Sequence, residues 1–222
     1  MSESKRILLL GAGGHCKSIL DSLMREGKYE DIGLIDKITR APYIVQEFKA
    51  TRGVLYLGDD NDLNRLFTEG YTDAFVSMGS IGDSSLRARL YTLIKNIGFR
   101  VPNIVDASAE VSPYALLGEG VYIGRKAVVN ADTKIGDCAI INTAAVVEHE
   151  CSIGDFVHIA PGSIVCGNVT IGFGTHIGAG SIIRQGAHIG CDTMIGMGSV
   201  VLDDIGNCMT AYGNPCKEVH NG

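Results

Sequence analysis

The stretch LGEGVYIGRKAVVNADTKIGDCAIIN (residues 117–142) carries a branched aliphatic residue at every sixth position. The same spacing continues outward in both directions, from Val105 to Val201, and every residue of the series is Val, Ile or Leu. Four residues after each aliphatic residue comes a small or β-branched one, such as Ala127 or Cys151. A repeat of fixed period has to be explained before any other feature of a chain.

The period of six predicts a parallel β-helix. A helix buries every third or fourth residue and a lone strand every second, so neither gives this spacing. A coil of three short strands does, because each side then supplies one large and one small inward side chain. Glycine follows the aliphatic residue in eight of the hexads, as at Gly124, and tolerates the corner dihedrals. Since one coil cannot bury its inner face alone, we expect about five stacked coils of triangular cross-section.

The residues before the repeats predict a small parallel α/β domain, because strand patterns alternate with helix patterns and glycine-bearing turns. The predicted strands are Lys5–Leu10, Ile32–Ile35, Val54–Leu57 and Thr72–Met78. One predicted helix follows Gly11–Gly14, and the others cover Asn61–Phe67 and Ser84–Ile97. We therefore expect a Rossmann-like domain over residues 1–103, followed by a β-helix domain with a C-terminal tail over residues 104–222.

The composition argues against several classes of partner. The net charge is −6, which does not suit a nucleic-acid-binding surface. The chain has no long apolar span and no signal-peptide core at its start, so we expect no membrane insertion and a cytoplasmic protein. The seven cysteines are odd in number and form no C-x-x-C pair, which favours reduced thiols over a disulfide framework or a metal site.

The loop Gly11-Ala12-Gly13-Gly14 is a candidate phosphate-binding site, because it joins a strand to a helix N-terminus. Asp36 ends the next strand, where such folds place an acid for a ribose or a base. Cys16 stands at the third glycine position of the dinucleotide fingerprint, so a nucleotide sugar is favoured over NAD. A plain tight turn, with His15 as an ordinary helix-start residue, remains the alternative.

The triplet Glu148-His149-Glu150 follows the inward residue Val147 and is a candidate catalytic site. A carboxylate on one ring nitrogen of a histidine fixes its tautomer and lets the other nitrogen act as a general base. His158 points outward from a neighbouring coil. The alternative interpretation is a solvated corner of three polar residues.

The whole chain resembles bacterial sugar acetyltransferases, typified by the UDP-4-amino-sugar N-acetyltransferases of bacillosamine synthesis, with the sialic acid O-acetyltransferases as close relatives. The resemblance rests on the opening LLLGAGGH, the LID at Leu34–Asp36, residues 141–172 (INTAAVVEHECSIGDFVHIAPGSIVCGNVTIG) and the ending YGNPCK at Tyr212–Lys217. It implies that the β-helix is left-handed. It also implies a homotrimer with active sites between subunits.

In this resemblance, His149 is the general base that takes a proton from the acceptor as it attacks the thioester of acetyl-CoA, and Glu150 orients its imidazole. Transfer is direct, without an acyl-enzyme. Gly167 would stabilise the oxyanion through its backbone N–H. The residues implied for the pantetheine path are His158, Ala179 and Met197, and those implied for the sugar nucleotide are Gly13, Gly14, His15, Asp36, Lys37, Gly79 and, at the acceptor, Asn142.

The resemblance thus predicts an acetyl-CoA-dependent enzyme that N-acetylates the 4-amino group of a nucleotide-linked amino sugar in bacterial glycan biosynthesis, with UDP favoured. Ser80 departs from the relatives, which often carry Asn, and residues 38–53 match none of them. A GDP-linked sugar and O-acetylation of sialic acid remain alternatives. So do a non-catalytic trimeric scaffold and a zinc enzyme of the carbonic-anhydrase type, although His149 and His158 are too far apart in sequence for that zinc site.

Overall fold

The structure is a computed structural model that describes residues 5–37 and 54–219. Contacts divide the chain into two units, one up to Gly79 together with Ser85–Ile104, the other comprising Ser80–Ser84 and the chain from Val105 onward. The expected first domain, residues 1–103, includes Ser80–Ser84, whereas the contacts group this segment with the second unit. The segment 38–53, over which the family resemblance found no matching residues, lies outside the described residues.

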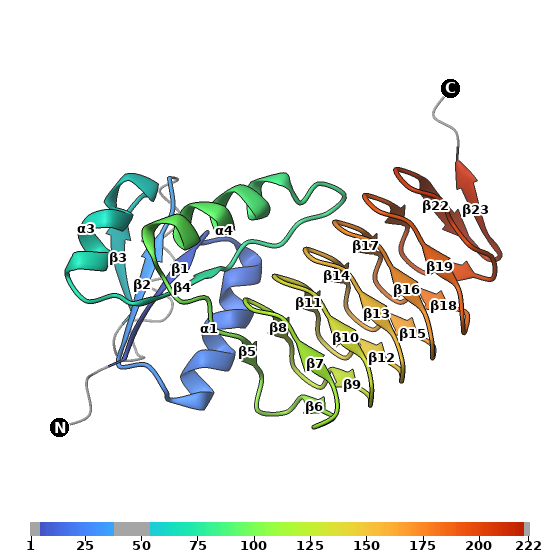
Figure 1. The fold of residues 1–222 in the computed structure, drawn as a ribbon, viewed down its shortest axis with the longest axis horizontal. Helices are drawn as coiled ribbons and strands as arrows, with labels where there is room; N and C mark the ends of the chain where they lie inside the picture. Colours follow the sequence, from blue (N-terminus) through green and yellow to red (C-terminus); the bar gives the residue numbers. More distant parts are fainter. Residues whose placement is uncertain (1–4, 38–53, 220–222) are drawn as a thin grey trace. The chain divides into compact units, whose positions relative to one another are not determined.

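The first unit is a four-stranded parallel sheet with helices (Figure 1). Its strands lie in the order β3-β2-β1-β4 and pair in parallel. The strands are β1 (Arg6–Leu10), β2 (Asp31–Ile35), β3 (Val54–Gly58) and β4 (Asp73–Val76). The helices are α1 (Gly14–Glu26), the short 3₁₀ helix η1 (Asp60–Asp62), α3 (Leu63–Thr68) and α4 (Ser85–Ile97).

Apolar side chains hold these elements together. Leu8 and Leu10 of β1 are buried in a cluster with Leu63 of α3 and Leu90 of α4. The strands are parallel, so their carboxyl ends share one edge of the sheet, and ligands of open α/β sheets bind at that edge. Gly11 and Asp36 follow directly after β1 and β2 at that edge.

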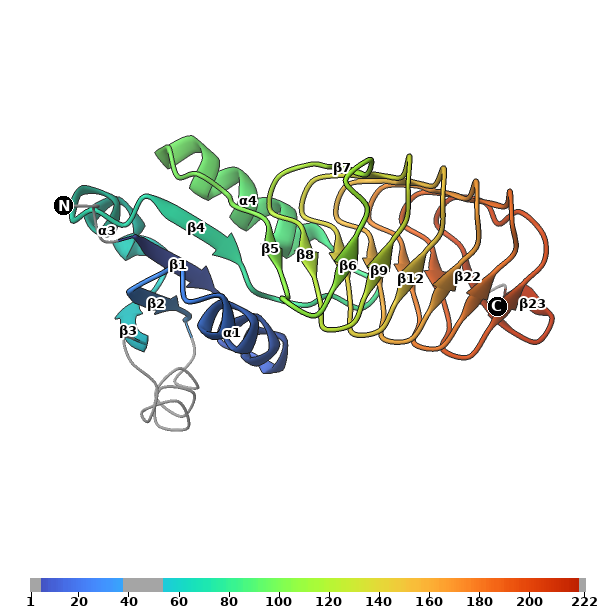
Figure 2. The same ribbon diagram turned by 90° about the horizontal axis from the view of Figure 1, so that it is seen from below.

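The second unit is a β-helix of two-residue strands that stack coil upon coil (Figures 1 and 2). The first face holds β5 (Ile104–Val105), β8 (Tyr122–Ile123), β11 (Ile140–Ile141), β14 (His158–Ile159), β17 (His176–Ile177), β20 (Met194–Ile195), β22 (Thr210–Gly213) and β23 (Cys216–Val219). The second face holds β6 (Glu110–Val111), β9 (Val128–Val129), β12 (Val146–Val147), β15 (Ile164–Val165), β18 (Ile182–Ile183) and β21 (Val200–Val201). The third face holds β7 (Leu116–Leu117), β10 (Lys134–Ile135), β13 (Ser152–Ile153), β16 (Thr170–Ile171) and β19 (His188–Ile189).

The interior follows the hexad pattern. From Ile123 to Val201 the aliphatic residues are almost completely buried, whereas those of the first coil, such as Val105, are only partly buried because no coil lies before them. Where the small interior residue is polar, its hydroxyl is satisfied by a backbone carbonyl. Ser163 donates to the carbonyl of Gly178 at 2.8 Å, for example. The core therefore buries no unpaired hydroxyl at that position.

The C-terminal hairpin of β22 and β23 covers the last coil (Figure 1). β22 pairs in parallel with β20, and β23 folds back on it in antiparallel fashion. Ala211 and Cys216 of the hairpin are buried in the interior of the β-helix. The hairpin thereby protects a strand edge that would otherwise be free to pair with another chain.

Candidate active site

His149 lies at the corner that joins the second and third faces, directly after β12. Its Nδ1 atom is 3.0 Å from Oε2 of Glu150. A carboxylate can only accept a hydrogen bond, so in the neutral imidazole Nδ1 carries the proton and Nε2 has the lone pair. Glu150 has a left-handed backbone with φ of 60°, and its N–H donates to the carbonyl of Ala131 at 3.0 Å. The corner thus turns the carboxylate back onto the imidazole.

Gly167 occupies the same corner one coil later. The N–H of the next residue, Asn168, donates to the carbonyl of His149 at 2.9 Å, which ties the two coils together. A Cβ atom built on Gly167 would lie 2.6 Å from Nε2 of His149. Only glycine therefore leaves room for the observed imidazole. Within residues 5–37 and 54–219, the Gly167 N–H makes no hydrogen bond.

His158 sits on the first face with both ring nitrogens engaged. Nδ1 is 2.8 Å from the carbonyl oxygen of Ser80, so Nδ1 must carry the proton. Nε2 is 3.0 Å from Nδ2 of Asn142 and accepts a hydrogen bond from that amide. The ring is buried and packs edge-on against His176, with ring centroids 4.8 Å apart. Burial lowers the pKa of His176, so the ring of His176 favours the neutral state.

Ala179 and Met197 lie at a different corner, the one that joins the first and second faces. They stack on successive coils, since the N–H of Gly198 donates to the carbonyl of Ala179 at 2.8 Å. Both are exposed, Met197 to 81%. Asn142 belongs to this corner as well. Within one chain the whole second face separates these residues from His149.

The second face carries an exposed row of aliphatic side chains, which we call the apolar ladder. Its members are the outward residues of successive strands and lie in register: Val128, Val146, Ile164, Ile182 and Val200. Ile164 is 39% exposed and Ile182 41%. The outward residues at the same level of the third face, such as Ser152 and Thr170, are polar. The ladder thus distinguishes one face of the β-helix from its neighbour.

The glycine-rich loop of the first unit is open to an approaching ligand. Gly13 precedes α1 and Gly14 begins it, and a Cβ on either would meet no atom within 4 Å. The N–H of Ala12 donates to Oδ2 of Asp36 at 2.6 Å. The carboxylate of Asp36 therefore braces the loop, while the N-terminus of α1 offers backbone N–H groups and a partial positive charge.

His15 follows this loop and is held neutral. Burial, and secondarily the charge of Arg87, lower the pKa of His15 to about 4. A Cβ on Gly79 would lie 3.4 Å from Cβ of His15, so the chain after β4 passes close to the imidazole. The structure thus brings Gly13, Gly14, His15 and Gly79 together around the start of α1.

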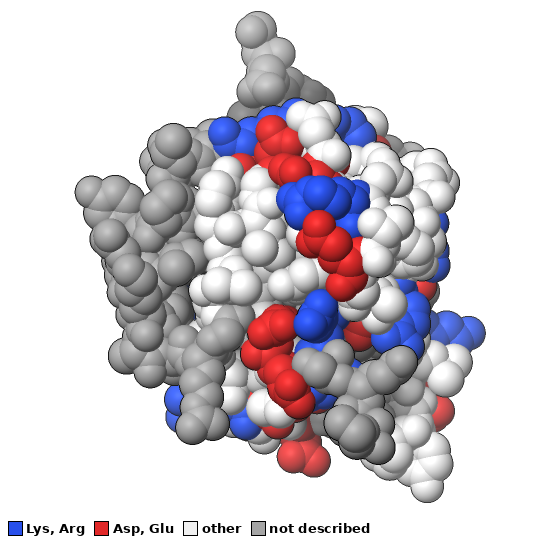
Figure 3. Space-filling model, turned by 90° about the vertical axis from the view of Figure 1, so that its left-hand side faces the viewer, with Lys and Arg blue, Asp and Glu red and all other residues white. Residues whose placement is uncertain are grey.

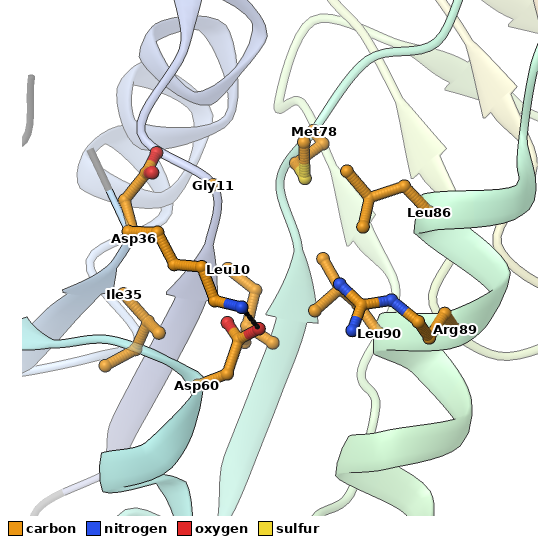
Figure 4. A pocket seen from close by; sticks show the side chains of 10 residues that line it. Leu10, Gly11, Ile35, Asp36, Asp60, Met78, Leu86, Arg89 and Leu90 are labelled. Atoms are coloured by element: carbon orange, nitrogen blue, oxygen red, sulfur yellow. Dashed lines mark ion pairs between the residues drawn. The ribbon is translucent and has the colours of Figure 1, made fainter.

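A hollow of about 200 Å³ lies at the carboxyl edge of the sheet (Figure 4). Its walls are mostly apolar and its rim is charged. The lining residues are Leu10, Gly11, Ile35, Asp36, Lys37, Asp60, Met78, Leu86, Arg89 and Leu90. Nζ of Lys37 lies 3.6 Å from Oδ2 of Asp60. The sequence had singled out Asp36 and Lys37 but not Asp60, although its position just after β3, at the edge where Asp36 follows β2, was the signal that could have found it.

In the described part of the chain, no group of three or more His, Cys, Asp or Glu residues could hold a metal ion. None of the helices within residues 5–37 and 54–219 is long and apolar enough to cross a membrane. On the face shown in Figure 3, basic and acidic side chains are interspersed. That face offers no continuous basic surface of the kind that binds nucleic acid.

Each unit matches a family model. Residues 6–94 match the PglD N-terminal domain, and residues 150–185 match the bacterial transferase hexapeptide (six repeats). An uncharacterized protein of Acanthamoeba polyphaga mimivirus is 29% identical over 134 residues, which are 60% of this chain. The chain spans about a quarter (24%) of the length of that relative.

Solved structures match nearly the whole chain. A variant of GDP-perosamine N-acetyl transferase from Caulobacter crescentus, in complex with CoA and GDP-perosamine, is 35% identical, with 97% of each chain covered and a TM-score of 0.86. The acetyltransferase domain of PglB from Neisseria gonorrhoeae, in complex with acetyl coenzyme A, is 33% identical, with 97% of this chain and 100% of that chain covered and a TM-score of 0.87. These matches confirm the predicted fold, an α/β domain followed by a left-handed β-helix of hexapeptide repeats.

Proposed function

The chain belongs to the hexapeptide-repeat sugar N-acetyltransferases, and we propose that it transfers the acetyl group of acetyl-CoA to the 4-amino group of a nucleotide-linked sugar. The relative from Caulobacter is described with CoA and GDP-perosamine, and that from Neisseria with acetyl coenzyme A. The observation that carries the proposal is the 3.0 Å contact between His149 Nδ1 and Glu150 Oε2, which leaves Nε2 able to accept a proton.

His149 acts as the general base. The amine nitrogen attacks the thioester carbonyl carbon while Nε2 of His149 takes the proton that the nitrogen gives up. When the tetrahedral intermediate collapses, the C–S bond breaks and the amide is complete. The CoA thiolate leaves and takes the proton back from Nε2, which returns His149 to its neutral form. Glu150 holds the imidazole in one tautomer and stabilises the imidazolium that forms. Such proton transfer contributes about 10²- to 10⁴-fold to rate.

The backbone N–H of Gly167 stabilises the oxyanion of the intermediate. It belongs to the corner of His149, and a Cβ built on the same glycine would lie 2.6 Å from Nε2 of the imidazole. A backbone donor is fixed before the reaction starts, so it costs no reorganisation when the negative charge develops. The same glycine also makes room for the base.

We propose that the complete site lies between two copies of the chain in a homotrimer. His149, Glu150 and Gly167 lie at one corner, whereas the pantetheine residues Ala179 and Met197 lie at another. A neighbouring β-helix packed on the apolar ladder would bring these two corners together. This arrangement would also remove the exposed aliphatic side chains of the second face from water, which favours association.

The first unit holds the sugar nucleotide. Gly13, Gly14 and the N-terminus of α1 contact the diphosphate, and Asp36 and Lys37 contact the nucleoside. The neutral His15 and the nearby Gly79 line the path toward the sugar, and Asn142, which His158 orients, places the acceptor. The family resemblance favours uracil as the base, and that preference stays a prediction, because the loop contacts parts that UDP and GDP share.

We place the reaction in the cytoplasm. None of the seven cysteines, all of which lie within the described residues, forms a disulfide. Free thiols are the normal state of cysteine in the reducing cytosol. Cell fractionation with an antibody against the chain would test this, since recovery in the membrane or periplasmic fraction contradicts it.

The decisive experiment measures thiol release from acetyl-CoA with UDP- and GDP-linked 4-amino sugars, free sialic acid, and no acceptor. We expect turnover of a nucleotide-linked amino sugar, reduced at least about a hundredfold in His149→Ala. His188→Ala is the matched control, since this exposed histidine lies on the third face. Turnover of sialic acid alone would shift the reaction to O-acetylation. No release with any acceptor would refute the proposed function.

A further inference from the structure

Asp60, on the charged rim of the hollow in the first unit, has no role in the chemistry described so far. We propose that Asp60 forms hydrogen bonds with the base of the sugar nucleotide and thereby selects guanine. The acceptor is then a GDP-linked rather than a UDP-linked sugar. This inference rests on the proposed function, and it reverses the preference for uracil that the family resemblance implied.

The hollow is a suitable place for a base. It lies at the carboxyl edge of the parallel sheet, next to Gly11 and Asp36, where folds of this type bind nucleotides. Asp36 is occupied with the loop, because its Oδ2 accepts the Ala12 N–H at 2.6 Å. Asp60 is not part of that contact. The diphosphate side and the base side of the site therefore have separate carboxylates.

The walls suit a flat heterocycle. Apolar side chains come from the ends of β1 and β2, from Met78, and from α4 through Leu86 and Leu90 (Figure 4). Asp60 and Arg89 enter the hollow from opposite walls in this view. A volume of about 200 Å³ is below the range of drug-sized pockets and therefore fits one ring system rather than a whole sugar nucleotide.

Asp60 presents an arrangement that guanine complements. An ionised carboxylate offers two acceptor oxygens and no donor. The Watson–Crick edge of guanine carries two adjacent donors, N1–H and the 2-amino group, beside the acceptor O6. Lys37, whose Nζ lies 3.6 Å from Oδ2 of Asp60, supplies a donor for O6. Lys37 and Asp60 together thus offer a hydrogen-bond partner to each polar group on the Watson–Crick edge of guanine.

Uracil does not fit the same arrangement. Its single N–H lies between two carbonyl oxygens, so a carboxylate that accepts from this N–H turns its second oxygen toward a carbonyl. The two acceptors would repel each other, and a buried polar group left unpaired is costly. Asp60 has only 19% of its side chain exposed, so water cannot readily relieve that conflict.

A rival interpretation is that Asp60 only holds Lys37 in place, or binds the ribose hydroxyls. Either role would affect every nucleotide equally, because all of them share the ribose and the diphosphate. Base reading, in contrast, changes the ranking of nucleotides. The two interpretations are therefore separable by comparing nucleotides that differ only in the base.

The test is calorimetric titration of the full chain with GDP, IDP and UDP. IDP lacks only the 2-amino group of GDP. We expect the wild type to bind GDP about tenfold to a hundredfold more tightly than IDP or UDP. In Asp60→Asn, affinity for GDP should fall by about the same factor, whereas affinity for UDP should not fall, because an amide offers one donor and one acceptor. Glu69→Gln, which alters an exposed carboxylate paired with Arg65, is the control.

The proposal is overturned if wild-type protein binds UDP as tightly as GDP, or if Asp60→Asn weakens GDP and UDP alike. The wild-type ranking of GDP, IDP and UDP decides the matter even if the variant does not fold. None of these results bears on acetyl transfer. Thiol release with either sugar nucleotide would still support the proposed function, whereas its absence together with tight GDP binding would leave base selection standing and refute the enzyme.

Discussion

The backbone of Gly167 lies so close to His149 that a Cβ at position 167 would be 2.6 Å from Nε2 of that histidine. The contact joins two coils of the β-helix at one corner. A hexapeptide repeat stacks equivalent positions over each other, so the room for a catalytic side chain on one coil is set by the residue on the next coil. The hexapeptide repeat places Gly167 next to His149, so the same glycine serves both the stacking of the coils and the position of the catalytic imidazole.

Gly167→Ala should reduce activity without unfolding the protein. The added methyl group would displace the imidazole from its observed position, and a displacement of about 1 Å can cost about a hundredfold in rate. We expect thiol release to fall by that order, with the circular dichroism spectrum and the melting temperature little changed. In Gly206→Ala the atom nearest to the new Cβ would belong to the Met209 side chain, at an ordinary contact distance of 3.6 Å, so this control should keep full activity. Wild-type activity in Gly167→Ala would refute the proximity argument.

Glu150 can be tested with two substitutions that separate geometry from charge. Glu150→Gln keeps an oxygen that accepts from Nδ1 of His149 but loses the negative charge that stabilises the imidazolium. Glu150→Ala loses both. We expect kcat to fall about tenfold in the glutamine variant and by a further factor of about ten in the alanine variant. The KM for acetyl-CoA should stay unchanged. If both variants were as active as the wild type, the contact between Glu150 and His149 would have no part in catalysis, and the two residues would form only a solvated corner.

The apolar ladder should control association. Replacing Ile164 and Ile182 by Glu places two charges on the second face, where packing against another copy would have to desolvate them. We expect a monomer by light scattering, with circular dichroism preserved and thiol release lost. Thr170→Glu places a charge on the third face instead and should leave both association and activity intact. A trimer that survives the double substitution would place the interface elsewhere.

The interior of the β-helix was predictable residue by residue because it depends on a local repeat. Val147 and Val165 are buried where the hexads put them. The segment Ser80–Ser84 was not predictable, because its attachment depends on a hydrogen bond from His158, distant in sequence, to a backbone carbonyl. A hydrogen bond to a backbone carbonyl leaves no pattern of side chains from which it could be predicted.

The candidate site was predictable in part for the same reason. His149 and Glu150 are adjacent in sequence, and their contact follows from the corner geometry. The hollow could not be predicted in this way, because its lining residues come from separate strand ends and from α4. They lie together only after the sheet and α4 have assembled. Leu86, Arg89 and Leu90 are spaced as on any helix that packs on a sheet, so the sequence could not distinguish a wall of the hollow from an ordinary core face.

His15 gives a prediction about the pH dependence of stability. Its pKa is about 4 in the folded protein, against an ordinary value of 6.5. Between these values the unfolded chain binds a proton that the folded chain does not, so stability falls as the pH is lowered through this window. At pH 5 the loss relative to pH 8 should be about 2 kcal/mol for this residue.

His15→Gln should therefore lose less stability than the wild type when the pH is lowered from 8 to 5. Glutamine does not titrate, so the variant lacks this residue's share of the pH dependence, whatever its stability at pH 8. Melting temperatures at both pH values give the comparison, and the exposed His188→Gln should retain the wild-type pH dependence. If His15→Gln also kept the wild-type loss, His15 would contribute nothing to the pH dependence, and the pKa of its imidazole could not be lowered by burial in the folded protein.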